Sequence, residues 1–243
     1  MPRIKAIIEY DGSRYMGFQV QDDLPTIELE LSNAISRVTG EEVKIYPSGR
    51  TDKGVHALGQ VIHFDTSKDI KPYGWQRAIN TYLPNDISVV SVEIVDESFH
   101  SRFSAKSKEY NYLIKIRNYS VFDRLYYANY KNLDLELMKK AMNKLLGVHS
   151  FKGFCSASVD PRKDFQKEIF DAHIESDGDV LRFVFIGTGF LKYQIRRMMG
   201  LIIEIGRHKD TLETIDKVFE TEDPRISHMK APAEGLYLVR VNY

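Results

Sequence analysis

Apolar and polar residues alternate along some stretches of the chain and recur at helical spacing along others. Alternation predicts strands, and recurrence every three to four residues predicts helices. Strands are predicted at 3–10, 43–46, 59–64, 87–95, 108–117, 170–175, 180–186 and 235–243. Helices are predicted at 25–39, 73–83, 134–146 and 190–205. A shorter helix is expected to start at Asp210 and Glu213, which are spaced as a capping box.

The connections between these elements indicate the fold class. Some neighbouring strands are joined by a short turn, as at Asp177-Gly178, and others are separated by helices. We therefore expect an α+β fold of mixed or antiparallel sheets with helices packed on one face. The second part of the chain repeats the theme of the first, which indicates two related halves. The polar and basic stretch 99–108 places their boundary near Ser104, giving halves 1–104 and 105–243.

Composition narrows the class of protein. The 243 residues are 43% hydrophobic, which is enough to fill a core. The single cysteine, Cys155, excludes an intrachain disulfide, and no Cys/His spacing predicts a zinc site. The Gly187-Thr188-Gly189 string lacks the third glycine of a dinucleotide site. We therefore expect no metal and no nucleotide cofactor. No signal-peptide core or membrane-length apolar run is present, so we expect a cytoplasmic protein without membrane contact.

The net charge gives no sign of a nucleic-acid partner. Thirty-four basic residues balance thirty-four acidic ones. Nucleic-acid-binding domains often have a pI above ~9, so the total charge by itself does not predict RNA binding. A neutral total can still contain a locally basic cleft.

The stretch 48–57, SGRTDKGVHA, carries the strongest candidate chemistry. It connects two predicted strands, and its two glycines allow tight or positive-φ backbone. Arg50 and Asp52 are two residues apart, so their side chains leave the same face of an extended backbone. The guanidinium favours an ionised carboxylate, which suits a nucleophile or an electrostatic stabiliser better than a general acid. The same residues also suit an ordinary turn, in which Asp and Gly are common.

The full string GRTDKGVHALGQV resembles the signature of the TruA-type tRNA pseudouridine synthases. The catalytic Asp of that family's motif falls on Asp52. Further strings resemble family segments in the same order: YDGSRYMGFQ, FHSRFSAKSKEYNYLI, GVHSFKGFC, GFLKYQIRRMMG and APAEGLYLVRV. The resemblance extends from Tyr10 to Val241 and implies the pseudouridine synthase fold, with an active-site cleft between the two halves.

The resemblance also implies roles for other residues. Tyr110 would lie against the target base, although its place on an alternating strand also predicts a core aromatic. Arg196 would pair with Asp52 and neighbouring phosphates, whereas such a helix arginine more often lies on a solvated face. Arg50 would help to keep Asp52 ionised. The candidate substrate contacts are Arg14, Lys53, Gly54, His56, Arg102, Lys106, Lys108, Arg197, Gly235 and Leu236.

The chain departs from the family pattern at four positions. Phe18 stands where Trp is usual, and Ser150 stands where Asp is common. Lys192 and Tyr193 replace the usual Tyr and His. Contacts that the usual side chains make in the family are therefore not carried over to this chain.

The function implied by the resemblance is isomerisation of uridine to pseudouridine at positions 38–40 in the anticodon stem-loop of tRNA. The reaction is redox-neutral, so no cofactor is expected, and the target base must leave its stem. Family members act as homodimers, and the resemblance implies the same here. One alternative is an RNA-binding protein of this fold without turnover. The other is a nucleoside hydrolase or base glycosylase, although no second carboxylate accompanies Asp52 to activate water.

Overall fold

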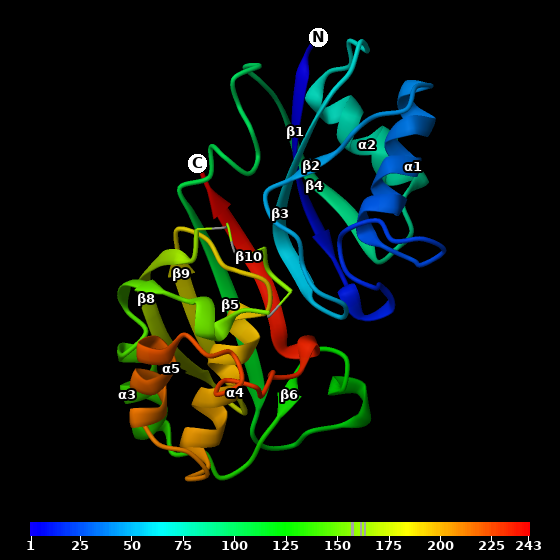
Figure 1. Ribbon diagram of the computed structural model, residues 1–243. Helices are drawn as coiled ribbons and strands as arrows, with labels where there is room; N and C mark the ends of the chain where they lie inside the picture. Colours follow the sequence, from blue (N-terminus) through cyan, green and yellow to red (C-terminus); the bar gives the residue numbers. More distant parts are fainter. Residues whose placement is uncertain (157, 161, 163) are drawn as a thin grey trace. The chain divides into compact units, whose positions relative to one another are not determined.

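The computed structural model describes residues 1–156, 158–160, 162 and 164–243, which form both strands and helices (Figure 1). The strands are β1 (Arg3–Tyr10), β2 (Tyr46–Pro47), β3 (His56–Asp65), β4 (Ile87–Val95), β5 (Ser107–Lys115), β6 (Ala128–Asn129), β7 (Gly147–Ser150), β8 (Gln166–Asp177), β9 (Val180–Gly187) and β10 (Leu236–Asn242). The α-helices are α1 (Ile27–Thr39), α2 (Pro72–Tyr82), α3 (Leu135–Asn143), α4 (Gln194–Gly206) and α5 (Glu213–Thr221). Antiparallel and parallel strand pairs both occur, which confirms the predicted α+β class with mixed sheets.

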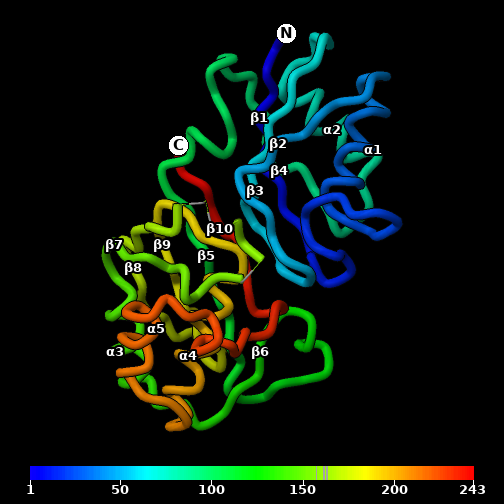
Figure 2. The backbone as a smooth tube through the Cα atoms, in the orientation of Figure 1, coloured from blue at the N-terminus to red at the C-terminus, as the bar shows by residue number. Residues whose placement is uncertain are grey.

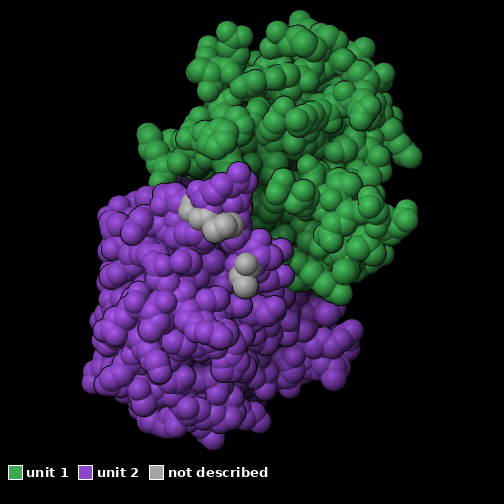
Figure 3. All heavy atoms as spheres, viewed as in Figure 1, with its two compact units in different colours: residues 1–106, 237–243 green, residues 107–236 purple. Residues whose placement is uncertain are grey.

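The chain forms two compact units. Unit 1 comprises Met1–Lys106 and Tyr237–Tyr243, and unit 2 comprises Ser107–Leu236 (Figure 3). The last strand belongs with unit 1 because β10 runs parallel to β3, with Tyr237 opposite His56 (Figure 2). The predicted halves differ from these units in giving the C-terminal strand to the second half, because sequence distance does not reveal this pairing.

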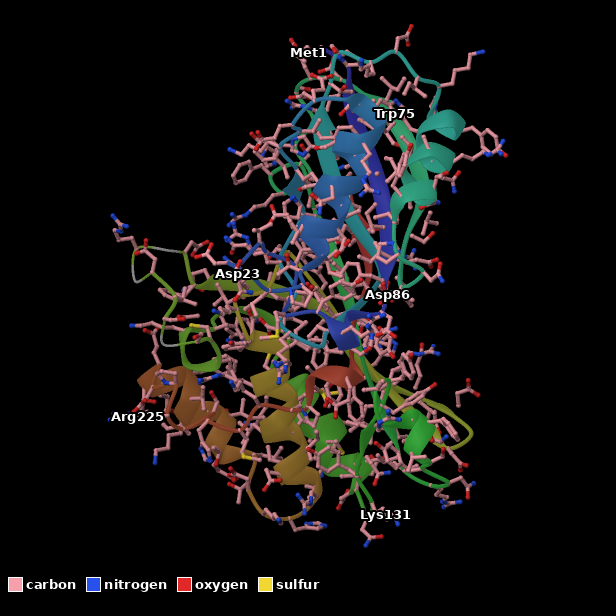
Figure 4. The ribbon with its side chains drawn as sticks, turned by 90° about the vertical axis from the view of Figure 1, so that its right-hand side faces the viewer. Met1, Asp23, Trp75, Asp86, Lys131 and Arg225 are labelled. Carbon is pink, nitrogen blue, oxygen red and sulfur yellow. The ribbon has the colours of Figure 1, made fainter. Side chains whose placement is uncertain are left out.

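Unit 1 is built around β1. This strand is antiparallel to both β3 and β4, and its alternate residues Ile4, Ala6 and Ile8 are fully buried. The helix α2 covers the sheet with Trp75, whose buried ring meets Phe64 of β3 edge-on at 5.6 Å between centroids (Figure 4). The period-two pattern of β1 thus supplies one face of the core of unit 1.

Unit 2 is built on β5, β9, β8 and β7, which pair in that order and antiparallel. The predicted hairpin is present, and β8 turns into β9 at Gly178, whose φ of 59° suits glycine. The helices α3 and α4 pack against each other. Asp134 caps α3, because its side chain accepts a hydrogen bond from Leu137 N at 3.0 Å.

Several element boundaries differ from the sequence predictions, among them those of α4, α5 and β2. The helix α4 begins at Gln194 rather than Phe190, because Tyr193 has a left-handed φ of 68° that interrupts the helical backbone. The predicted capping box of α5 is absent, since the helix starts at Glu213 and Asp210 instead accepts a hydrogen bond from Thr211 N at 2.8 Å. Of the strand predicted at 43–46, only its last residue pairs, within β2.

Two kinds of feature are missing from the described ranges. No helix within them is both long enough and apolar enough to cross a membrane. Nor do they contain a group of three or more His, Cys, Asp or Glu side chains placed to hold a metal ion.

His63 on β3 is a buried titratable group of unit 1. Its side chain is 1% exposed, and its Nδ1 accepts a hydrogen bond from Ser101 N at 3.1 Å. Burial lowers the pKa of His63 to about 4, helped by the nearby charges of His100 and Arg3 and opposed by the carboxylate of Asp65. The native protein therefore keeps this imidazole neutral in mildly acidic solution.

This burial predicts a specific loss of stability in acid. The unfolded chain protonates His63 below about pH 6.5, so its contribution to stability is present above that pH and lost as the pH falls towards 4. Between about pH 7 and pH 4.5, the unfolding free energy of His63→Gln should fall by about 2 kcal/mol less than that of the wild type. Urea denaturation at the two pH values measures the difference. The exposed His228 provides a control, His228→Gln, and equal pH dependence in all three proteins would contradict the assignment.

Candidate active site

Backbone hydrogen bonds hold the predicted catalytic loop on both sides of Asp52. Thr51 O accepts a hydrogen bond from Phe18 N at 3.0 Å. On the other side, Gly54 N donates to Tyr15 O at 3.4 Å. The loop is therefore fastened to the segment that follows β1, and its shape is set within unit 1.

Two glycines in that segment permit the close packing of the two loops. A Cβ on Gly17 would lie 2.9 Å from Thr51 O, and Gly17 also has a φ of 102°. A Cβ on Gly12 would overlap the carbonyl oxygen of Val55. Because only glycine lacks this atom, both positions require it for the backbones to touch.

Buried polar side chains support the start of the catalytic loop. The Tyr10 hydroxyl lies 2.8 Å from Thr51 Oγ1, and burial raises the pKa of Tyr10 to about 12. Gln60 accepts a hydrogen bond from Ser48 Oγ at 2.8 Å and donates one to Gly49 O at 2.8 Å. These bonds satisfy buried polar groups and fix the backbone that leads to Asp52.

His56, one of the predicted substrate contacts, lies at the end of the loop and is 2% exposed. Its Nδ1 is 3.1 Å from Gly12 N, which donates to it, and 3.2 Å from Asp11 Oδ1. Its ring stacks on Tyr237 of β10 at 4.6 Å between centroids. His56 therefore ties three parts of unit 1 together, and its contact with substrate stays a prediction.

The charged side chains of the loop differ in exposure. Asp52 is half-buried, whereas Arg50 and Lys53 are exposed. The proposed effect of Arg50 on the carboxylate stays a prediction.

Asp86, just before β4, supports the segment that follows β1 and was not singled out in the sequence (Figure 4). It accepts a hydrogen bond from the Tyr15 hydroxyl at 2.6 Å, and its backbone oxygen accepts one from Asp11 N at 2.9 Å. Burial and then this bond to Asp86 raise the pKa of Tyr15. The predicted substrate contact Arg14 lies 3.4 Å from the same carboxylate but keeps most of its side chain exposed. No local motif marks Asp86, because only the fold brings it to this segment.

Unit 2 carries the other two predicted catalytic residues. Tyr110 on β5 is 8% exposed, and its ring meets Phe190 edge-on at 5.3 Å. Arg196, in the first turn of α4, is half-buried and donates from Nε to Ala231 O at 2.8 Å. Both side chains are therefore oriented by contacts within unit 2.

The remaining predicted cations are placed in different ways. Arg102 and Lys106 are exposed in unit 1, and the Arg102 guanidinium lies 5.6 Å from the centroid of the Phe103 ring. Arg197 in unit 2 is half-buried and donates to Pro224 O at 2.6 Å. Burial lowers the pKa of Arg197. The Arg197 guanidinium is therefore partly engaged with the protein's own backbone.

The last predicted contacts lie where β5 and β10 begin. Lys108 is half-buried on β5, while Gly235 and Leu236 are buried. A Cβ on Gly235 would lie 2.9 Å from both Leu113 O and the Tyr112 ring, so glycine lets this segment lie against β5. Asp52 belongs to unit 1, whereas Tyr110 and Arg196 belong to unit 2. Their meeting in one site is part of the proposal below.

Comparisons with known proteins agree on one family. The family profile described as tRNA pseudouridine synthase matches residues 6–104 and 141–243. The chain is 41% identical over 244 residues to tRNA pseudouridine synthase A of Geobacillus sp. (strain WCH70), covering 99% of this chain and 98% of that protein. It is 43% identical over 245 residues to tRNA pseudouridine synthase A of Exiguobacterium sp. (strain ATCC BAA-1283 / AT1b), covering 100% and 98% respectively. A chain in the crystal structure of a Cbf5-Nop10-Gar1 complex also matches, over 82% of this chain and 54% of the matched chain. Its TM-score is 0.34 and its sequence identity is 12%, so no residue role is drawn from it.

The chain belongs to the tRNA pseudouridine synthase family. It is an isomerase that acts on uridine in tRNA. The family and the enzyme class predicted from the sequence are confirmed.

Proposed function

We propose that the protein forms pseudouridine at positions 38–40 in the anticodon stem-loop of tRNA, with Asp52 as the nucleophile. The observation that carries this proposal is the way unit 1 holds Asp52. Its backbone is bonded on both sides while its side chain is half-buried rather than enclosed. A carboxylate held in this way is preorganised for reaction and remains within reach of a bound nucleotide.

The chemistry needs a nucleophile but no redox partner. The C1′–N1 glycosidic bond breaks, the uracil rotates, and a C1′–C5 bond forms. N1 gains a proton and C5 loses one, so the composition and oxidation state of the nucleotide are unchanged. Attack on the ribose and attack on the base both use the ionised carboxylate of Asp52.

Three other side chains complete the proposed site. Tyr110 stacks on the flipped base, an interaction of about 1–3 kcal/mol that offsets part of the cost of flipping. Arg196 and Arg50 keep Asp52 ionised by their positive charge. The order imposed on Tyr110 and Arg196 within unit 2 supports these roles.

The substrate contacts and the assembly state are also part of the proposal. The enzyme acts as a cytoplasmic homodimer on tRNA, without a cofactor. The cationic residues contact the phosphates of the tRNA, and the buried or loop residues form the walls of the pocket. The proposed contacts are Arg14, Lys53, Gly54, His56, Arg102, Lys106, Lys108, Arg197, Gly235 and Leu236.

The proposed positions can be tested with tRNA transcripts that carry tritium at uracil C5. Label is released to water when C5 loses its hydrogen. We expect release from a transcript with uridine at positions 38–40, and none from a matched transcript with cytidine at all three. A control transcript keeps uridine at positions 38–40 and has cytidine in place of the other anticodon-loop uridines. It should release label at the same rate as the unaltered transcript. Release from the transcript that lacks uridine at 38–40 would contradict the positions while leaving the enzyme class intact.

A further inference from the structure

Three cationic side chains of unit 2 gather around the ring of Tyr193, just before α4. Their distances to the ring centroid are 4.4 Å for Lys230 Nζ, 5.2 Å for Lys192 Nζ and 5.9 Å for Arg196 Cζ. All three distances lie within the ~6 Å over which the face of an aromatic ring attracts a cation. These four residues are called the Tyr193 cluster below.

The two lysines of the cluster present their charge to solvent. Lys192 and Lys230 are both exposed, while Tyr193 is half-buried. Across the described part of the chain, neither ammonium group forms an ion pair or a hydrogen bond. The segment of Lys230 is nevertheless fixed, because Ala231 N donates to Arg196 O at 2.8 Å and Ala231 O accepts from Arg196 Nε at 2.8 Å. The lysines are therefore held near each other despite their like charges.

The cluster also lies at the end of α4 where positive charge is least favourable. Free backbone N–H groups make a helix N-terminus partially positive, so cations there reduce stability. The first turn of α4 contains no acidic residue, and Tyr193 provides no side-chain cap. Arg197, in the same turn, has a buried Nε without a hydrogen-bond partner in the described structure. Cations at the positive end of a helix reduce stability, and local features that reduce stability are typical of functional sites. Positive charge concentrated in this way would bind an anion.

The anion follows from the substrate of the family. Lysine binds phosphate as a point charge, and a tRNA backbone presents a row of phosphates. We propose that Lys192 and Lys230, held on the Tyr193 ring, form a phosphate-binding subsite for the tRNA backbone. This inference deepens the proposed function and rests on it for tRNA as the ligand. It also gives a role to Lys192 and Tyr193, where the chain departs from the family pattern.

Salt dependence of tRNA binding tests the subsite. The slope of log K against log salt concentration is about −0.9 per neutralised phosphate of a duplex and is steepened by each ionic contact. Removal of both ammonium groups in Lys192→Ala/Lys230→Ala should make the slope less steep by about 1.8. At about 150 mM salt, this corresponds to about 30-fold weaker binding of an unmodified tRNA transcript. Each single variant should show about half of the change in slope.

A matched control separates this site from a general effect of charge. Lys131→Ala/Lys209→Ala removes two exposed lysines near the C-terminal end of α4, where Asp134 N bonds to Gly206 O at 2.8 Å (Figure 4). This variant should keep the wild-type slope. The Lys192/Lys230 variant loses both the mutual repulsion of the two ammonium groups and their attraction to the Tyr193 ring, so its Tm should stay close to that of the wild type. An unchanged slope in that variant, or an equal change of slope in the control, would overturn the proposal.

Pseudouridine formation by the wild type is measured separately, so that the two proposals fail independently. If pseudouridine forms and the slope of the Lys192/Lys230 variant is unchanged, the subsite alone is rejected. If no pseudouridine forms but the difference in slope persists, the proposed function is rejected and the RNA-binding subsite stands.

Discussion

Replacement of Asp52 by Asn should lower the single-turnover rate of pseudouridine formation by at least about 10⁴-fold and leave tRNA binding intact. An amide has nearly the shape of the carboxylate but is not a nucleophile. The backbone bonds of the loop, which involve Thr51 and Gly54, do not depend on the changed atoms. Rapid-quench measurement of tritium release at saturating enzyme gives the rate. Fluorescence anisotropy with labelled tRNA gives the affinity.

The matched control for this variant is Asp23→Asn. Asp23 is an exposed residue of unit 1 with a φ of 56°, which asparagine adopts readily (Figure 4). The control makes the same change of charge and should keep the wild-type rate and affinity. If Asp52→Asn kept a rate within about 10-fold of the wild type, another group would have to be the nucleophile.

The second large effect is expected from Gly12→Ala. The new methyl group would overlap the carbonyl oxygen of Val55 and push the catalytic loop away from the segment after β1. Overpacking of this kind costs about 2 kcal/mol of stability, and a shift of about 1 Å in a catalytic group can lower the rate about 100-fold. Urea denaturation and single-turnover tritium release measure the two losses.

Gly178→Ala shows whether lost stability alone explains a lower rate. A Cβ there meets open space, but the φ of 59° makes alanine unfavourable by about 1–2 kcal/mol. The variant should therefore be less stable than the wild type but equally active per folded molecule. If Gly12→Ala lost stability without a larger loss of activity than Gly178→Ala, the packing of the two loops would not position Asp52.

Elements with a clear period were predictable from the sequence. The alternation of Ile4, Ala6 and Ile8 predicted β1, and the structure has the same bounds, Arg3–Tyr10. The helix α1 was equally clear, because its buried stripe ends before Gly40, whose φ of 75° terminates the helix. In these elements, local preference and tertiary burial require the same backbone, so pattern alone was sufficient.

Local pattern was insufficient where the tertiary fold overrides it. The apolar spacing of α4 continues back to Phe190, but the left-handed backbone of Tyr193 delays the helix. The last strand follows unit 2 in sequence, yet its pairing with β3 places it in unit 1. The pairing of the last strand has no local signal, because it depends on residues distant in the chain.

The candidate site likewise contains a residue that the sequence indicates and residues whose contacts only the fold shows. Asp52 was found through a motif, and the structure places it in a braced loop, although its role as nucleophile is still to be tested. Tyr10 and Gln60, which brace the loop, lie within strings that carry the family resemblance, but those strings do not show what the two side chains contact. Asp86, which supports the neighbouring segment, lies in no such string. They come to the loop through strand pairing and loop packing. Sequence therefore suggests which residue reacts, and the fold shows what holds its loop.

The most direct test of the account is a product balance with the wild-type enzyme and C5-tritiated tRNA. Tritium released, pseudouridine formed and free uracil are measured in the same reaction after digestion to nucleosides. We expect one pseudouridine for each tritium released and no free uracil. Free uracil with an abasic site would indicate a hydrolase, and bound tRNA without released tritium would indicate a binding protein. Either result would contradict the account.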